Sequence, residues 1–147
     1  MLTITTNNSG EAAKYFFDTI QHQVETDGKV IIALKGDLGA GKTTLVQEFC
    51  KMCGVQDVVT SPTFPIMNVY EGEINEQKTV IHHFDWYRLD SMADLGVINL
   101  PMILSQLGIF FIEWPEKLPE VLGDYEHYVL SIDIEGESRI YNLEKHN

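Results

Sequence analysis

A three-layer α/β sandwich around a mixed parallel and antiparallel central sheet is the fold that this 147-residue sequence predicts. Two short apolar runs, residues 30–34 and 108–112, contain β-branched or aromatic side chains and no polar alternation, which is typical of buried strands. Segments with helical spacing of apolar residues lie before and after the first run. Two hairpin patterns are inserted, and because hairpins add antiparallel strands, the sheet is expected to be mixed.

The first helix is expected to open at Glu11, with Asn8 or Ser9 as its cap, and to stop at residues 27–28, Asp-Gly. Its apolar side chains recur at helical spacing, as Ala12, Tyr15, Phe16, Phe17 and Ile20. A second helix should run from Lys42 to about Met52 and stop at Gly54.

The rest of the chain predicts short helices and hairpins. Residues 91–96 and 100–106 have the length of short helices, and residues 61–65, Ser-Pro-Thr-Phe-Pro, are expected to be extended because proline disfavours helix at the residue before it. One hairpin should pair residues 66–71 with 78–84 across a polar, glycine-containing loop. A second should pair residues 128–135 with 138–143 around Gly136.

The charge balance excludes one class of function. The chain has 22 acidic and 10 basic residues, a net charge of −12, and Arg88 and Arg139 are its only arginines. Nucleic-acid affinity comes mostly from lysine and arginine that neutralise phosphates, so autonomous DNA or RNA binding is not expected. A basic partner surface suits this charge better. No apolar run approaches the ~20 residues of a membrane span and no secretory signal is visible, so we expect one cytoplasmic domain, residues 1–147.

Cys50 and Cys53 form a C-x-x-C pair, a spacing found in zinc and redox sites. A zinc site usually needs a second pair of ligands, and a redox pair belongs at the start of a helix, where the thiolate is stabilised. These two thiols fall near the end of a predicted helix, and we expect them to be buried and inert.

The strongest chemical signal is a glycine-rich loop between the first buried strand and the second helix. It matches G-x-x-x-x-G-K-[ST], the phosphate-binding P-loop, in the strand-before, helix-after context that this motif requires. Glycines let main-chain N–H groups wrap a phosphate, the lysine reaches the β- and γ-phosphates, and the hydroxyl ligates Mg²⁺. The nucleotide-binding residues are expected to be Gly36, Asp37, Leu38, Gly39, Ala40, Gly41, Lys42, Thr43 and Thr44.

Phosphoryl chemistry also needs an acid near the metal, and two carboxylates qualify. Glu113 ends the second buried strand, the expected setting of a Walker-B acid, and Asp85 ends a hairpin strand. The alternatives are a solvated strand-end carboxylate for Glu113 and a structural salt bridge with Arg88 for Asp85. The residues do not decide which acid holds Mg²⁺ and which orients the attacking water.

Several polar and aromatic residues lie near these motifs. His82 and His83 should point to opposite faces of their strand, so they are not expected to share one metal ion. Ser61 and Thr63 are either γ-phosphate sensors or turn caps. Trp114 is either a core residue or an exposed anchor for a partner.

Four segments together resemble the TsaE (YjeE) family: residues 36–44, GDLGAGKTT; 61–64, SPTF; 83–89, HFDWYRL; and 112–118, IEWPEKL. These are bacterial P-loop ATPases of tRNA N6-threonylcarbamoyladenosine (t6A) biosynthesis. The resemblance spans roughly residues 8–120 and implies a P-loop NTPase-like fold, binding of ATP and Mg²⁺, and association with TsaD and TsaB, a complex that ATP hydrolysis would reset. Pro65 and residues 100–107 look less typical of the family, and the last ~25 residues carry no motif.

Carried onto this chain, the resemblance implies that Lys42 and residues 39–44 bind phosphates and that Thr43 and Glu113 hold Mg²⁺. Asp85 would be needed for hydrolysis, and Trp114 would belong to the functional surface. The competing functions are a non-enzymatic ATP-dependent binding module and a small-molecule kinase. A kinase usually needs several arginines, which this chain lacks, and a GTPase would need an N-K-x-D motif, which is absent.

Overall fold

The protein is described here by a computed structural model that covers residues 1–62, 67–96 and 98–147. In these ranges seven strands form one sheet in the order β1-β7-β6-β2-β5-β4-β3. The strands are β1 (Leu2–Thr6), β2 (Lys29–Lys35), β3 (Met67–Ile74), β4 (Gln77–Asp85), β5 (Gly108–Glu113), β6 (His127–Glu135) and β7 (Ser138–His146). The central strands β4, β5, β2 and β6 are parallel neighbours, and the outer pairs are antiparallel. The predicted mixed sheet is confirmed.

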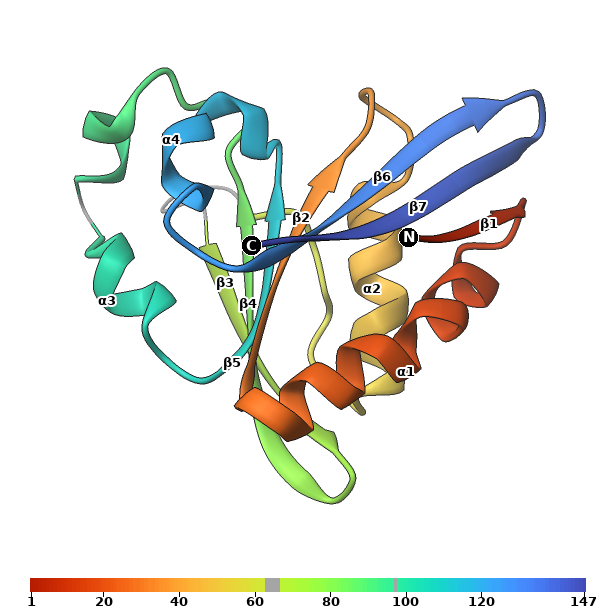
Figure 1. The fold of residues 1–147 in the computed structure, drawn as a ribbon, viewed down its shortest axis with the longest axis horizontal. Helices are drawn as coiled ribbons and strands as arrows, with labels where there is room; N and C mark the ends of the chain where they lie inside the picture. Colours follow the sequence, from red (N-terminus) through yellow and green to blue (C-terminus); the bar gives the residue numbers. More distant parts are fainter. Residues whose placement is uncertain (63–66, 97) are drawn as a thin grey trace.

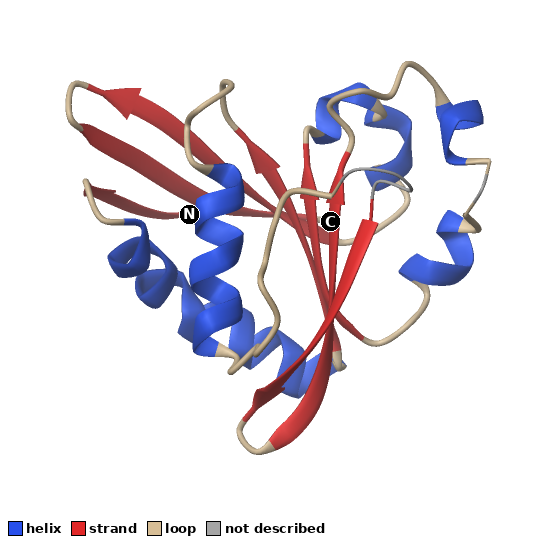
Figure 2. Cartoon of the chain, turned by 180° about the vertical axis from the view of Figure 1, so that it is seen from behind, coloured by secondary structure: helices blue, strands red, loops and turns tan. Residues whose placement is uncertain are grey.

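Helices cover both faces of this sheet. Figure 1 shows α1 (Ser9–Asp27) and α2 (Lys42–Met52) on one face and α3 (Leu100–Leu104) and α4 (Pro119–Leu122) on the other. Two short 3₁₀ helices, η1 (Met92–Leu95) and η2 (Pro115–Lys117), accompany α3 and α4. The reverse view in Figure 2 shows the same three layers, which confirms the predicted sandwich. None of the helices in the described ranges has the length and apolar character to cross a membrane.

The apolar run in β2 supplies both cores because neighbouring residues of a strand point to opposite faces. Val30, Ile32 and Leu34 pack with α1 and α2, whereas Ile31 and Ala33 pack with the layer of α3 and α4. All five are buried. Each large aliphatic side chain contributes roughly 1.5–3 kcal/mol by its burial, so this strand is fixed in register and position. The same alternation decides which side chains of β4 and β5 can reach α2.

The predicted cap and end of the first helix are confirmed, although α1 begins at Ser9, two residues before the predicted start at Glu11. The side chain of Asn8, rather than that of Ser9, caps α1 by accepting a hydrogen bond of 3.0 Å from the main-chain N–H of Glu11. Gly28 ends the helix in the left-handed conformation with φ of 73°, which favours glycine. The second predicted helix, from Lys42 to about Met52, agrees with the bounds of α2.

The β3–β4 hairpin corrects a predicted loop. Residues 72–77 were expected to separate the strands, but strand pairing continues to Ile74 and Gln77. The turn is only Asn75 and Glu76, with φ of 49° and 67°, the conformation of a tight hairpin turn. The acidic residues before it alternate with buried Tyr70 and Ile74, so a polar sequence still forms an edge strand. The predicted extended stretch at residues 63–65 and the strand start at residue 66 lie outside the described residues.

Other elements were not predicted. Strand β1 is the exposed edge of the sheet, and its threonine-rich sequence has no continuous apolar signal. It is held by pairing with β7, which runs three residues beyond the predicted end, to His146. Helix α4 has only four residues, too few for a helical period to be recognised.

Candidate functional site

The candidate site lies where β2, β4 and β5 end, on the face of the sheet that packs against α2. Strand register sets Asp85 beside Glu113 and Glu113 beside Leu34, so all three strands end at one edge. Odd-numbered residues Ile81 and Ile109 of the same strands belong to the core under α1 and α2. Because side-chain direction has a period of two, the carboxylates of Asp85 and Glu113 are carried to that same face. Carboxyl ends of parallel strands are where open α/β sheets bind ligands.

The glycine-rich loop joins β2 to α2 at this edge. Gly39 and Gly41 have φ of 83° and 107°, a region that L residues with a side chain rarely adopt. Gly41 is the N-cap residue of α2, and the helical hydrogen bonds begin with Leu45 N donating to Gly41 O at 2.9 Å. The 11-residue helix therefore points the unpaired N–H groups and positive dipole end of its first turn at the loop.

A cavity of about 290 Å³ opens beside this loop. Its lining residues are Leu38, Gly39, Gly41, Lys42, Thr43, Thr44, Ser61, Asp85, Tyr87, Glu113 and Trp114. The structure thus brings together most of the predicted nucleotide-binding residues with both predicted acids. Gly36, Asp37 and Ala40 belong to the loop but not to the lining. Gly36 instead lies against β6, since a Cβ atom added to it would be 2.9 Å from the carbonyl oxygen of Ile132.

Lys42 is nearly buried, with 5% of its surface exposed, at the centre of this arrangement. Its Nζ donates to the carbonyl oxygen of Gly36 and, at 3.1 Å, to that of Asp37. The ammonium also lies 4.1 Å from the centre of the Trp114 ring, a cation–π contact. Burial lowers the pKa of Lys42, and the carboxylate of Glu113 opposes that shift.

Glu113 is a buried carboxylate with two side-chain partners. The hydroxyl of Thr43 lies 3.0 Å and 2.9 Å from its two carboxylate oxygens, which joins the start of α2 to the end of β5. The Nε2 atom of His83 lies 2.5 Å from Oε2 of Glu113. The alternative of a solvated strand-end carboxylate is therefore wrong for Glu113, which is 3% exposed.

Asp85 has a different environment. Its two carboxylate oxygens accept hydrogen bonds from Ser61 Oγ, at 2.9 Å, and from the main-chain N–H of Tyr87, at 3.0 Å. It is partly exposed to the cavity. The alternative salt bridge with Arg88 is not among the ion pairs of the described residues, and Arg88 is exposed. Of the two interpretations left open for Ser61, its position on the cavity beside Asp85 fits the one that places it at the site, while Thr63 lies outside the described residues.

The two histidines of β4 point to opposite faces, as predicted. His83 contacts Glu113, whereas the His82 ring stacks on Phe110 with ring centres 4.3 Å apart. Burial lowers the pKa of His82. Hence a shared metal ion on this pair is excluded by geometry, and His83 is a polar partner within the site.

Trp114 is held over the loop by an unusual backbone conformation. Its φ is 59°, in the left-handed region that is uncommon for bulky residues. This turn after β5 directs the indole toward Lys42 and sets it 4.8 Å, centre to centre, from the Tyr87 ring. Trp114 is partly buried, so it is neither a pure core residue nor a fully exposed anchor.

The oxygen atoms at the site suit magnesium. Mg²⁺ prefers a few hard oxygen ligands and keeps its remaining positions for water and phosphate. The Thr43 hydroxyl and the Glu113 carboxylate supply such oxygens beside the loop. Across the described residues, no three His, Cys, Asp or Glu side chains are grouped to hold a metal by themselves. The donor set therefore fits a metal that is shared with a phosphate.

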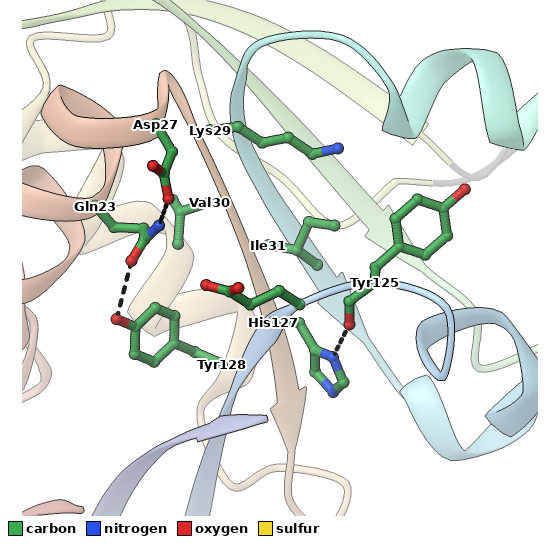
Figure 3. Close-up of a pocket in the computed structure, with 9 residues that line it drawn as sticks. Gln23, Asp27, Lys29, Val30, Ile31, Tyr125, His127 and Tyr128 are labelled. Atoms are coloured by element: carbon green, nitrogen blue, oxygen red, sulfur yellow. Dashed lines mark hydrogen bonds between the residues drawn. The ribbon is translucent and has the colours of Figure 1, made fainter. Parts of the chain in front are cut away.

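A second cavity, of about 220 Å³, lies at the opposite end of the sheet. Figure 3 shows it between the end of α1 and the starts of β2 and β6, lined by Gln23, Asp27, Lys29, Tyr125, His127 and others. This second cavity is lined neither by residues of the glycine-rich loop nor by Asp85 or Glu113. Two hydrogen bonds join residues of its lining, from the Tyr128 hydroxyl to Gln23 and between His127 and the Tyr125 carbonyl. We therefore place the candidate chemistry at the loop.

Sequence reasoning missed two contacts of the site. Tyr87, between the recognised residues Asp85 and Arg88, lines the cavity and packs on Trp114. Arg139, in the C-terminal segment where no motif was recognised, donates from Nε to the carbonyl oxygen of Ala40 at 3.1 Å. The only available signal for Arg139 was the scarcity of arginine in the chain.

Comparisons with known proteins identify the family. Residues 7–142 match the family model of the threonylcarbamoyl adenosine biosynthesis protein TsaE. The tRNA threonylcarbamoyladenosine biosynthesis protein TsaE of Nostoc sp. is 38% identical over 115 residues, 76% of this chain and 67% of the relative. The protein of that name from Treponema pallidum is 34% identical over 107 residues, 73% and 75% of the two chains.

A solved structure agrees with the fold. The crystal structure of Bacillus subtilis YdiB superimposes with a TM-score of 0.64 at 23% identity, covering 97% of this chain and 83% of that one. The family model spans nearly all of the chain, including the loop, both acids and Arg139. On these grounds the chain belongs to the TsaE family.

Proposed function

We propose that this chain is a Mg²⁺-dependent ATPase that serves tRNA t6A biosynthesis through the TsaB–TsaD complex. The observation that carries the proposal is the convergence of Lys42, Thr43, Asp85 and Glu113 on one cavity beside a P-loop. The role in t6A biosynthesis comes from the names of the relatives. We take residues 1–147 as a single P-loop ATPase domain.

In this proposal the loop and the start of α2 hold the phosphates of ATP. Main-chain N–H groups of residues 39–44 would donate to phosphate oxygens, aided by the positive end of the helix. Lys42 would place its ammonium on the β- and γ-phosphates, where negative charge is concentrated. The Trp114 ring lies against the Lys42 ammonium and limits the access of water to it. The attraction between this ammonium and the phosphates is therefore stronger than it would be in water.

The two acids have separate roles in the proposal. Thr43 and Glu113 would hold Mg²⁺, which, when bound, supplies positive charge to the β- and γ-phosphate oxygens. The Glu113 carboxylate is hydrogen-bonded to His83 and to the Thr43 hydroxyl. This arrangement supports Glu113 and Thr43 as the ligands of Mg²⁺. Asp85 is nearer to solvent and held by Ser61, and its carboxylate would orient the attacking water and accept its proton.

The acidic surface supports action through partners. With a net charge of −12, the chain is a poor ligand for tRNA, so the tRNA substrate would be handled by the complex to which this chain binds. A basic face on TsaB or TsaD would attract it, and the association should weaken as salt rises.

Steady-state ATP hydrolysis with and without TsaB–TsaD tests the proposal. Parental protein should turn over slowly alone and faster with the complex, and Glu113→Gln should raise the Mg²⁺ concentration needed for half-maximal rate. Asp85→Asn should lower turnover while nucleotide still binds. Glu126→Gln, which removes an exposed carboxylate paired with Lys145, is the matched control and should behave as the parent.

Each alternative has its own result in this experiment. No turnover in either state, with ATP still bound, would indicate the non-enzymatic binding module. Phosphate transfer to a small acceptor in place of release would indicate the kinase. Parental rates and Mg²⁺ dependence in both Glu113→Gln and Asp85→Asn would remove the assignment of the two acids.

A further inference from the structure

The C-terminal hairpin of β6 and β7 contacts the P-loop from outside. Figure 1 shows β6 beside β2 and β7 on the far side of β6, near the loop that connects β2 to α2. Gly36 has no room for a Cβ atom against the Ile132 carbonyl of β6, and Arg139 of β7 reaches Ala40. The hairpin therefore supports the loop at its first residue and near its middle.

The hydrogen bond between Arg139 and the Ala40 carbonyl is the contact that holds the loop to the hairpin. Main-chain N–H groups of a phosphate-binding loop converge on the ligand. The Ala40 carbonyl oxygen accepts its hydrogen bond from outside the loop, from Arg139 of β7. Ala40 is 1% exposed, and a carbonyl group in such a position needs a donor from the protein. The α2 hydrogen bonds begin only with Gly41, and the donor that reaches Ala40 is the Nε atom of Arg139, at 3.1 Å.

The strand that carries Arg139 is itself fixed. Arg139 pairs across the sheet with Thr6 of β1 and with Ile134 of β6. Its Nη1 donates to the Ser138 carbonyl at 3.4 Å, and the side chain is half-buried. A donor held in this way restricts where the Ala40 carbonyl can lie, and with it the directions of the adjacent loop N–H groups.

We propose that Arg139 is a positioning residue, which holds the P-loop in the conformation that binds the phosphates of ATP through its hydrogen bond to the Ala40 carbonyl. The inference rests on the proposed function, because it assigns a role in ATP binding. Arg139 acts here by the direction of its Nε–H group, not by its charge. The loop contacts the phosphates before and during hydrolysis. Loss of the hydrogen bond from Arg139 should therefore weaken ATP binding and raise KM with little change in kcat.

Two substitutions of similar length separate the hydrogen bond from charge and packing. In Arg139→Gln the amide nitrogen stands at the position of Nε along the side chain, so a neutral donor is retained. In Arg139→Met the side chain is of comparable length but has no donor. Arg139→Ala is a second donor-free variant. Lys145→Ala, at the other end of β7, removes a cation that pairs with Glu126 and is the control.

ATP affinity by titration and steady-state KM and kcat should be measured on folded protein for all variants. Arg139→Gln and Lys145→Ala should bind ATP within about threefold of the parent. The donor-free variants should bind about tenfold more weakly and show a matching rise in KM with kcat within about twofold, as expected for an unsatisfied buried carbonyl. Simple loss of folded protein would lower the apparent kcat and leave KM unchanged.

Other results would overturn the inference. Equal loss of affinity in Arg139→Gln and Arg139→Met would assign the effect to charge. Parental affinity in the folded donor-free variants, or a loss confined to kcat, would leave the contact with no positioning role. If the parent protein binds no ATP, the proposed function fails instead, which distinguishes the two failures.

Discussion

Replacing His83 by leucine should destabilise the protein through Glu113. The Nε2 atom of His83 lies 2.5 Å from Oε2 of Glu113, and the two side chains are 0% and 4% exposed. Leucine has nearly the volume of histidine but no hydrogen-bond donor. The substitution therefore removes one of the two side-chain partners of a buried carboxylate without opening a large cavity, and only the Thr43 hydroxyl remains.

The burial of the pair sets the size of the effect. A buried polar group left unsatisfied costs about 1–3 kcal/mol, and charged acceptors lie at or above the upper end of that range. We expect His83→Leu to lower the free energy of unfolding by about 3 kcal/mol, a large part of the ~5–15 kcal/mol typical of a folded protein. In a Glu113→Gln background, where the acceptor is neutral, the cost should be smaller by about 1.5 kcal/mol.

Urea unfolding of the parent, the two single variants and the double variant gives this coupling energy directly. Added Mg²⁺ should recover part of the stability of His83→Leu because a bound cation pairs with the carboxylate, and it should recover none where Glu113 is glutamine. The reasoning is refuted if His83→Leu costs the same in both backgrounds within about 0.5 kcal/mol. A change in the slope of the unfolding curve would instead mean that the unfolded or folded state had altered.

The other predictions concern the loop, the thiols and the surface. Lys42→Ala should lower ATP turnover by about 10²–10³-fold without unfolding the protein, as measured by single-turnover hydrolysis and circular dichroism. Burial raises the pKa of Cys50 to about 12 and that of Cys53 to about 11, so at pH 8 a thiol reagent should label them only in denaturant. Because both values exceed the ordinary 9.0, the thiols contribute stability below pH 9 that is lost progressively as pH rises toward 11 and 12; pH-dependent urea unfolding checks this. Filter binding at physiological salt should detect no retention of tRNA by the isolated chain, and tight, salt-sensitive retention would contradict the charge argument.

The parts of the fold that could be predicted have strong local signals. The apolar run of β2, the glycine-rich loop and α2 follow one another in sequence, so their order and bounds were readable without tertiary contacts. Asp85 and Glu113 were recognised because each ends an apolar or alternating strand. Their convergence depends on the parallel pairing of β4 with β5, which no sequence pattern predicted.

The remaining features depend on contacts between distant segments. Glu113 is bonded by His83, 30 residues away, and Ala40 by Arg139, 99 residues away. Neither contact leaves a periodic or spacing pattern. Strand β1 is similar, because a polar edge strand is stabilised by its partner β7 and not by a continuous apolar run of its own. Sequence patterns therefore located the chemical groups but not the residues that hold them.

The distribution of positive charge is the reason to expect that the proposed hydrolysis depends on a partner. Of the described residues that line the cavity, Lys42 is the one cation, against the carboxylates of Asp85 and Glu113. Arg139 is hydrogen-bonded to the outside of the loop, and Arg88 is exposed. Fast hydrolases add a cation at the transferring phosphate, often an arginine finger worth 10³–10⁵ in rate. A lining with two carboxylates also predicts that a bound triphosphate needs Mg²⁺ for charge balance, so we expect slow turnover alone and stimulation by a basic partner from the same arrangement of charges.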